Sequence, residues 1–306
     1  MLVLQPMFHE TIWGGPRLSR FTEAKGDSIG HFYTCYCREG ISNVILNGEH
    51  KGKHLNEVFP LWKKDVGMEE YPFFPLTISL TEADHNLSIQ VHPDDKTAIE
   101  VEHRNRGKRE SWYFLEAPEN GLLINGCKCK DKEEVRKLLD QERYMEILDA
   151  IPVKVGDYVF VEPGTLHCIS AGSLVYEIEE GSDSTYRFYD FDRLDKNGKK
   201  RELHLEMAYL TLDPKKQSVV QHYPDGQEIV EATYASQKFE NITYFKNDTD
   251  DLKCFTLVYG TATCDGVEIT QGTTVLLFPG EEISDLDAKL AFTARMRRDI
   301  NLAPVE

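Results

Sequence analysis

Short runs of alternating apolar and polar residues, each bounded by Gly, Pro, Asn or Asp, recur along most of this 306-residue chain. Successive side chains of a strand point to opposite faces, so such a run is typical of a β-strand with one packed face. The frequent turn residues leave few stretches for long helices, and we therefore expect a mainly β protein. The clearest runs are Leu87–His92, Ser111–Leu115, Asp157–Val161, Ser173–Ile178 and Cys254–Tyr259.

Helical patterns are fewer. The stretch Asp131–Met145 has acidic residues early, apolar residues at helical spacing and good helix formers, which predicts one or two short helices. A second candidate helix is Leu55–Val66. The β-rich domain is therefore expected to carry a few helices, including a helical insertion near residues 131–147.

The boundary between domains is marked by a change in composition. The polar motifs thin out after His204, and Asp213–Gln227 contains a Pro-Asp-Gly turn that is typical of a linker. Another run of strands follows over Tyr244–Arg298. We therefore expect a large β-rich domain over residues 1–210 and a small all-β domain over residues 211–306.

The formal net charge is −17. A chain this acidic repels nucleic acid and anionic membrane surfaces, which excludes both as expected partners. No apolar run approaches the roughly 20 residues that span a bilayer, and no signal peptide is recognisable, so a cytoplasmic location is expected. An anionic substrate would need local positive charge, which Arg104–Arg109 and Lys196–Arg201 can supply.

The seven cysteines do not form a disulfide pattern. Two Cys-x-Cys pairs occur, Cys35/Cys37 and Cys127/Cys129, but they lack the Cys-x-x-Cys spacing of common structural zinc sites. We interpret them as small apolar side chains at alternate strand positions.

The segment Leu87–Pro93 reads Leu-Ser-Ile-Gln-Val-His-Pro. In a strand its apolar residues share one face, and Ser88, Gln90 and His92 share the other. Neighbours on one face lie about 7 Å apart, so the side chains of Gln90 and His92 can converge on one ion. The alternative is an ordinary exposed face of a half-buried strand.

Two later segments add residues that can bind a metal. Glu110 shares a strand face with Trp112, and His167 follows a Pro-Gly turn. Taken alone, a glutamate such as Glu110 is more often simply solvated, and a histidine such as His167 is more often structural. Together, two imidazoles, a carboxylate and the amide of Gln90 suit Zn²⁺. Two histidines and one carboxylate also suit non-haem Fe(II), so the metal stays open on these grounds.

Acidic and basic residues crowd the segment Ser173–Arg193. Glu177 and Glu179 alternate with apolar residues and so share a strand face, while Asp183 and Arg187 follow a Gly-Ser turn. Arginine is well suited to bidentate phosphate contacts and to stabilising an oxyanion. Beside a metal pocket these residues could bind a phosphosugar and move protons; the alternative is a surface ion-pair network.

In this order, the motifs resemble the type I mannose-6-phosphate isomerases, and most of all their shorter bacterial form. The resemblance covers most of the first 205 residues. It implies a cupin (jelly-roll) catalytic domain and a zinc-dependent isomerase that interconverts mannose 6-phosphate and fructose 6-phosphate through an enediol(ate). The resembling motifs are Ile12–Gly15, Leu87–Pro93, Gly107–Glu110 with Trp112, Pro163–His167, Ser182–Arg187 and Arg201–Leu205.

The functional residues of that family fall on matching positions of this chain. The implied ligands of one zinc ion per chain are Gln90, His92, Glu110 and His167. The implied active-site residues are Arg187, Lys108, Glu177 and Asp183. Arg187 would stabilise the enediolate, and any of the other three could be the base. Ser88 is implied to hold the phosphate, and Arg193, where longer relatives carry a lysine, is expected to bind it too.

The expected partner is a small phosphosugar, and the sequence carries no signal of oligomeric state. Three alternatives remain open. One is a cupin isomerase for another phosphosugar, such as glucose 6-phosphate, and a second is a sugar-binding cupin that kept the pocket without catalysis. The third is a cupin of other chemistry, such as an Fe(II) dioxygenase, which metal identity and oxygen dependence would distinguish.

Overall fold

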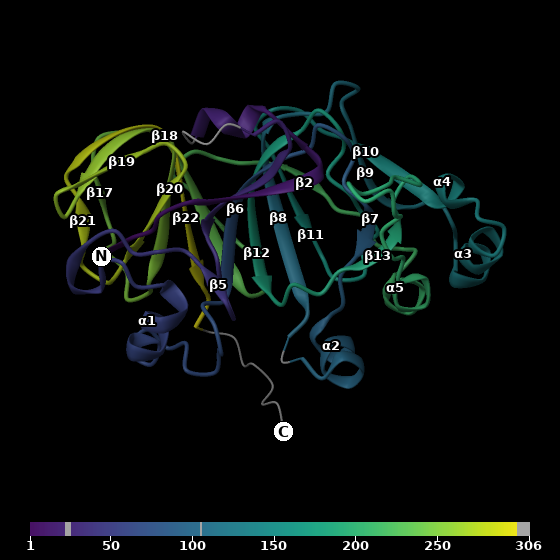
Figure 1. Cartoon of the computed structure of the whole chain (residues 1–306), viewed down its shortest axis with the longest axis horizontal. Helices are drawn as coiled ribbons and strands as arrows, with labels where there is room; N and C mark the ends of the chain where they lie inside the picture. The colour runs from purple at the N-terminus through teal and green to yellow at the C-terminus, as the bar shows by residue number, and fades with distance from the viewer. Residues whose placement is uncertain (22–25, 105, 299–306) are drawn as a thin grey trace.

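The computed structural model describes residues 1–21, 26–104 and 106–298, and these form three β layers with short helices at the edges (Figure 1). The central sheet is covered on one face by a set of short strands, the front layer, and on the other by the C-terminal sheet. This arrangement confirms the mainly β fold class, and the front layer facing the central sheet agrees with the expected jelly roll.

The strands of the central sheet run antiparallel in the order β14-β11-β8-β12-β6-β3-β2. The expected runs Ser111–Leu115 and Asp157–Val161 are confirmed in β8 and β11, and Ser173–Ile178 is confirmed in β12 from its second residue. The bounds are β14 Val220–His222, β11 Asp157–Val161, β8 Lys108–Glu116, β12 Leu174–Gly181, β6 Leu76–Glu82, β3 Ile29–Cys35 and β2 Met7–Gly15.

The front layer joins two short antiparallel ladders. His167, in the loop after β11, bridges to Gln90 in β7 and to Asn125 in β9, and so links the ladders into one layer. The expected strand Leu87–His92 is regular only over its centre, and Leu87 is buried in a different apolar cluster from Ile89 and Val91. The bounds are β7 Ile89–Val91, β13 Tyr186–Tyr189, β9 Leu122–Cys127 and β10 Leu148–Pro152.

The C-terminal sheet has the order β1-β20-β18-β22-β16-β15, with β19 paired to β18, which contains the expected run Cys254–Tyr259. Its β1 comes from the N-terminus, while β14, after residue 210, pairs with β11 of the central sheet. Two strands therefore cross the expected boundary between residues 1–210 and 211–306, a division that stays a prediction. The bounds are β1 Leu2–Val3, β20 Thr273–Leu277, β18 Lys253–Cys264, β22 Asp285–Met296, β16 Tyr234–Ile242, β15 Glu228–Val230 and β19 Val267–Thr270.

The helices are short and lie at the edges of the layers. The helix expected at Leu55–Val66 is confirmed over its first two turns, and the insertion near 131–147 contains α3 and α4. The Asp131 carboxylate caps α3 by accepting a hydrogen bond from the Glu134 N–H at 2.9 Å. No helix among the described residues is long and apolar enough to cross a membrane. The bounds are α1 Leu55–Trp62, α2 Asp95–Glu102, α3 Lys132–Leu139, α4 Tyr144–Ile147 and α5 Leu205–Thr211, with 3-10 turns at Arg17–Phe21 and Gly48–His50. Two further ladders of two residues per strand pair β4 (Cys37–Arg38) with β5 (Ile41–Ser42) and β17 (Phe245–Lys246) with β21 (Glu282–Ile283).

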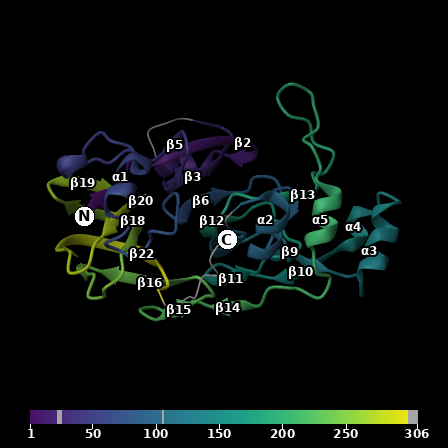
Figure 2. The ribbon, with the colours of Figure 1, turned by 90° about the horizontal axis from the view of Figure 1, so that it is seen from below.

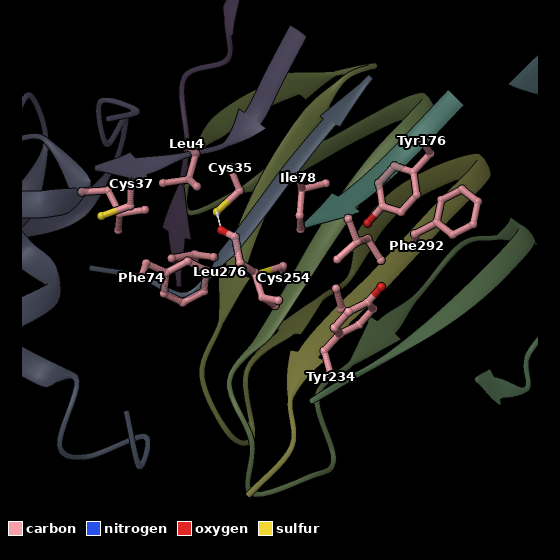
Figure 3. Close-up of a cluster of buried hydrophobic side chains, with 14 of the residues drawn as sticks. Leu4, Cys35, Cys37, Phe74, Ile78, Tyr176, Tyr234, Cys254, Leu276 and Phe292 are labelled. Carbon is pink, nitrogen blue, oxygen red and sulfur yellow. Dashed lines mark hydrogen bonds between the residues drawn. The ribbon is translucent and has the colours of Figure 1, made fainter. Parts of the chain in front are cut away.

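Strand alternation gives the central sheet two different faces. Toward the C-terminal sheet, Tyr113 and Tyr176 pack on Phe292 of β22, and the rings of Tyr176 and Phe292 stack with centroids 4.2 Å apart (Figure 3). Toward the front layer, β8 presents Glu110 and Trp112 instead. The C-terminal sheet therefore seals the apolar back of the central sheet and leaves the polar face for chemistry.

The described cysteines are all free thiols. Cys35 and Cys37 are fully buried in the core between the central and C-terminal sheets, and Cys129 is buried in the cluster under the helices. The burial of these three agrees with their interpretation as small apolar side chains, whereas Cys127 is partly exposed and Cys129 lies beyond the end of β9.

The packing of Phe292 predicts a stability effect. Replacing it with alanine should lower the free energy of unfolding by about 3–5 kcal/mol, because a fully buried ring would leave a cavity between two sheets. The same change at Phe8, which is 47% exposed, should cost less than about 1 kcal/mol. Denaturant unfolding of both variants measures the difference; equal losses would contradict this account of the interface.

Candidate metal centre and active site

A buried cluster of two imidazoles and one carboxylate lies between the central sheet and the front layer. His92 follows β7, Glu110 lies in β8, and His167 lies in the loop after β11. Glu110 Oε2 is 3.1 Å from His92 Nε2, and Glu110 Oε1 is 2.9 Å from His167 Nε2. All three side chains are almost completely buried. The structure therefore brings together three of the predicted metal ligands from segments far apart in sequence.

Backbone carbonyls fix the orientation of both rings. His92 Nδ1 lies 2.8 Å from the Ser184 carbonyl, and His167 Nδ1 lies 2.8 Å from the Thr165 carbonyl. A carbonyl can only accept, so each Nδ1 carries the proton and donates. The Nε2 atoms are left to face the carboxylate, which is the arrangement that prepares a histidine for metal binding.

The protonation and hydrogen bonding of the cluster show which kind of ligand it fits. Burial lowers the pKa of His92 to about 4, more than the nearby Glu110 carboxylate raises it, so the ring is neutral at pH 7. Its Nε2 lone pair then faces an oxygen that can only accept. Glu110 Oε1 is also buried and has no hydrogen-bond donor among the described residues. A cation held by these atoms would satisfy all of them, so the residues present fit a metal ion.

Gln90 lies beside this cluster. It forms a two-way backbone pair with His167, and its Nε2 is 3.4 Å from His167 Nε2. Its amide oxygen accepts a hydrogen bond from Ser88 Oγ at 3.3 Å. A half-turn of the amide would exchange its two ends and place the oxygen toward His167, as a fourth ligand requires. The predicted ligand Gln90 and the predicted phosphate residue Ser88 are therefore adjacent.

Lys108 is buried on the other side of Glu110. Its Nζ is 3.1 Å from Glu110 Oε2 and 2.7 Å from Glu179 Oε1. Burial alone would lower the pKa of Lys108, but the carboxylates of Glu179 and Glu110 more than offset this and raise it. Lys108 therefore carries its proton at neutral pH and supplies a fixed positive charge. Glu179 was not among the predicted site residues, although its alternation with Glu177 was a visible signal.

Glu177 lies on the same face, opposite Trp112 in the pairing of β12 with β8. One carboxylate oxygen accepts from Ser79 Oγ at 2.9 Å and Thr81 Oγ1 at 2.6 Å, and the other accepts from Trp112 Nε1 at 2.9 Å. Burial, followed by the charges of Glu179 and Glu110, raises the pKa of Glu177 to about 7. A positive ion at Glu110 would reduce the part of this rise in the pKa of Glu177 that comes from the Glu110 charge. The side chain is thus a well-oriented buried carboxyl.

Arg187 stands opposite Gln90 in the ladder of β13 and β7, and cross-strand partners share a face. Its Nη1 donates to the Glu202 carbonyl at 2.7 Å. Its Nε is buried without a hydrogen-bond partner among the described residues. The guanidinium therefore retains donor capacity next to the cluster.

The remaining predicted residues, Asp183 and Arg193, make their polar contacts outside the cluster. Asp183 is exposed and pairs with Arg104 at 2.5 Å, at a pocket of about 320 Å³ that does not contain the metal ligands. Arg193 donates to the Asp190 carboxylate at 2.5 Å and to the Asn86 carbonyl. The structure thus does not bring Asp183 into the cluster, and it engages Arg193 with protein groups.

Comparisons with known proteins agree with this geometry. The chain is 37% identical over 209 residues to a mannose-6-phosphate isomerase of Streptococcus mutans, and 36% identical over 208 residues to one of Bacillus subtilis. Each alignment covers 68% of this chain and 66% of the relative, just under two thirds of the relative's length. A comparison with protein-family models finds no match.

A solved structure extends the likeness to the whole fold. The crystal structure of the Bacillus subtilis mannose 6-phosphate isomerase superposes with a TM-score of 0.78 at 27% identity, over 96% of this chain and 98% of that one. The similarity therefore includes the C-terminal sheet as well as the layers that carry the cluster. On these grounds the chain belongs to the mannose-6-phosphate isomerase family.

Proposed function

We propose that the chain is a zinc-dependent mannose-6-phosphate isomerase, which interconverts mannose 6-phosphate and fructose 6-phosphate through an enediol(ate). The convergence of His92 Nε2, His167 Nε2 and the Glu110 carboxylate in a buried cluster carries the proposal. The names of its relatives support the substrate, since they share more than a third of their aligned residues with this chain.

The zinc ligands in this proposal are Gln90, His92, Glu110 and His167. Two imidazole nitrogens and two oxygens form a donor set that zinc accepts readily. When bound there, zinc would supply Lewis-acid polarisation of the sugar oxygens. The remaining chemistry belongs to the side chains around it.

Proton transfer between C1 and C2 needs a base that is held in place. Glu177 suits this role best, because it is buried on the same face as Glu110 and oriented by hydrogen bonds from two other strands. Lys108 already carries its proton and is better suited to donate one or to balance negative charge. Asp183 is exposed and occupied by Arg104. We therefore favour Glu177 as the base.

Positive charge is needed wherever negative charge develops in the reaction. Arg187 would stabilise the enediolate, because its guanidinium shares a face with Gln90 and its Nε is unpaired within the described chain. Ser88, which donates to Gln90, and Arg193 would bind the phosphate.

Turnover of mannose 6-phosphate should depend on the bound metal. The purified protein should convert mannose 6-phosphate to fructose 6-phosphate in a coupled assay, lose this activity on chelation and regain it with added zinc, because the buried ligands cannot polarise the sugar themselves. Glucose 6-phosphate serves as the comparison substrate. A metal-loaded, folded protein without turnover of mannose 6-phosphate would contradict the proposal.

Metal content should depend on Glu110 in particular. Glu110→Gln removes the only charge among the proposed ligands, so the purified variant should lose most of the roughly one zinc ion per chain expected in the wild type. Glu116→Gln, at the outer end of the same strand, should keep it. Elemental analysis of both variants measures this, and wild-type zinc in Glu110→Gln would rule out the assigned ligands.

Arg187→Ala should lower kcat by about 100- to 1,000-fold, the usual effect of removing a donor that stabilises an oxyanion. Zinc content should stay at the wild-type level, because the Arg187 guanidinium is not a ligand. Arg136→Ala, which breaks an ion pair with Glu206 on the helical edge, is the matched control and should leave kcat unchanged. Full activity in Arg187→Ala would show that another group stabilises the enediolate.

A further inference from the structure

The segment between β13 and α5 forms an arm, here defined as residues 190–203, that projects from the rest of the molecule (Figure 2). The chain reverses at residues 196–198, so the arm has an outgoing leg before this turn and a returning leg after it. The two legs are paired: Leu194 bridges to Lys200, and the Asp195 N–H donates to the Lys199 carbonyl at 2.8 Å. The arm begins three residues after Arg187 and ends just before α5. Its base therefore adjoins the residue proposed to stabilise the enediolate.

Asp190 joins the two legs at this base. Its carboxylate accepts two hydrogen bonds from Arg201, at 2.8 and 2.6 Å, and one from Arg193 at 2.5 Å. Arg193 lies on the outgoing leg and Arg201 on the returning leg. The Asp190 side chain is 5% exposed, whereas those of Arg193 and Arg201 are 18% and 25% exposed. One buried carboxylate thus pairs with two arginines and offsets the repulsion between them.

The two arginines link Asp190 to different parts of the site. Arg193 donates to the Asn86 carbonyl, in the loop that leads into β7 and its ligand-bearing segment. Arg201 is followed directly by Glu202, whose carbonyl accepts from Arg187 Nη1 at 2.7 Å. His204, two residues on, accepts from the Arg187 N–H at 3.1 Å through Nδ1. The returning leg therefore holds both the backbone and the guanidinium of Arg187.

We propose that Asp190 is a positioning residue for the proposed reaction: by holding Arg193 and Arg201 together, it fixes the Glu202 carbonyl and thereby the guanidinium of Arg187. The proposal rests on the isomerase function proposed above. Because Asp190 contacts none of the metal ligands, it should act on Arg187 and not on metal binding. A displacement of about 1 Å at a reacting group can cost about 100-fold in rate, so the effect should be measurable.

The same arm offers a matched control. Asp192 pairs with Lys200 at 2.5 Å, which is also an acid–base pair between the two legs, but both side chains are more than 60% exposed. A solvated pair of this kind contributes little. Asp192→Asn therefore makes the same chemical change as Asp190→Asn, in the same arm, without removing the buried connection.

The first test compares the two variants under saturating mannose 6-phosphate. Asp190→Asn should lower kcat by about 10- to 100-fold with zinc content close to wild type, while Asp192→Asn should keep kcat within about twofold of wild type. Wild-type kcat in Asp190→Asn, or loss of its zinc, would overturn the proposal. Should Asp190→Asn not fold, Arg201→Gln removes the charge of one of the two partners of Asp190, and the same results are expected of it.

The second test separates positioning from a general structural role. In an Arg187→Ala background, Asp190→Asn should change kcat by less than about twofold, because the group that it positions is already absent. A loss that multiplies with that of Arg187→Ala would show that Asp190 acts independently, and would overturn the proposal.

A third readout does not require activity. The arm contains Lys196, Lys199 and Lys200, so trypsin should cut it faster in Asp190→Asn than in Asp192→Asn once the legs are released. Equal cleavage rates would show that Asp190 does not hold the arm. A wild-type protein without turnover would refute the proposed isomerase function, and this comparison would still decide whether Asp190 joins the legs.

Discussion

The structure depends on one electrostatic constraint: the buried Glu110 carboxylate faces imidazole nitrogens whose protons are held on the far side of each ring. Backbone carbonyls fix those protons on Nδ1 of His92 and His167, so lone pairs converge in a space closed to water. Such an arrangement is costly unless a positive charge occupies its centre. The three ligand segments come from different strands and loops, and the layered fold is what holds them at this distance.

The fold also accounts for how a chain with a net charge of −17 can present positive charge to an anionic sugar. Lys108 lies on one side of Glu110, and Arg187 stands opposite Gln90 on the other. Both are fixed by neighbouring acceptors, Glu179 for Lys108 and a main-chain carbonyl for Arg187. The C-terminal sheet packs on the opposite face of the central sheet, while the face toward the front layer also carries a buried apolar cluster that includes Trp112, Phe114 and Leu123.

Sequence patterns predicted the parts of this site that follow strand alternation. Glu177 was recognisable because apolar residues alternate with it, and Glu110 because it shares a strand face with Trp112; the expected strands are present in β8 and β12. Pairings between distant segments were not recognisable, because no local pattern encodes which acid meets which base. Asp183, expected among the acidic residues of the pocket, pairs with Arg104 and lines a pocket of about 320 Å³ that does not contain the metal ligands. The connection from Asp190 to Arg201 spans an arm whose geometry only tertiary structure reveals.

The most direct test of the account is a crystal structure of the zinc-loaded protein, with anomalous diffraction measured on both sides of the zinc absorption edge. The account predicts one strong peak that is present only above the edge, about 2.0–2.2 Å from His92 Nε2, His167 Nε2 and a Glu110 oxygen, with the Gln90 amide oxygen turned toward it. Zinc bound elsewhere, or imidazole rings that turn Nδ1 toward Glu110, would contradict the central claim.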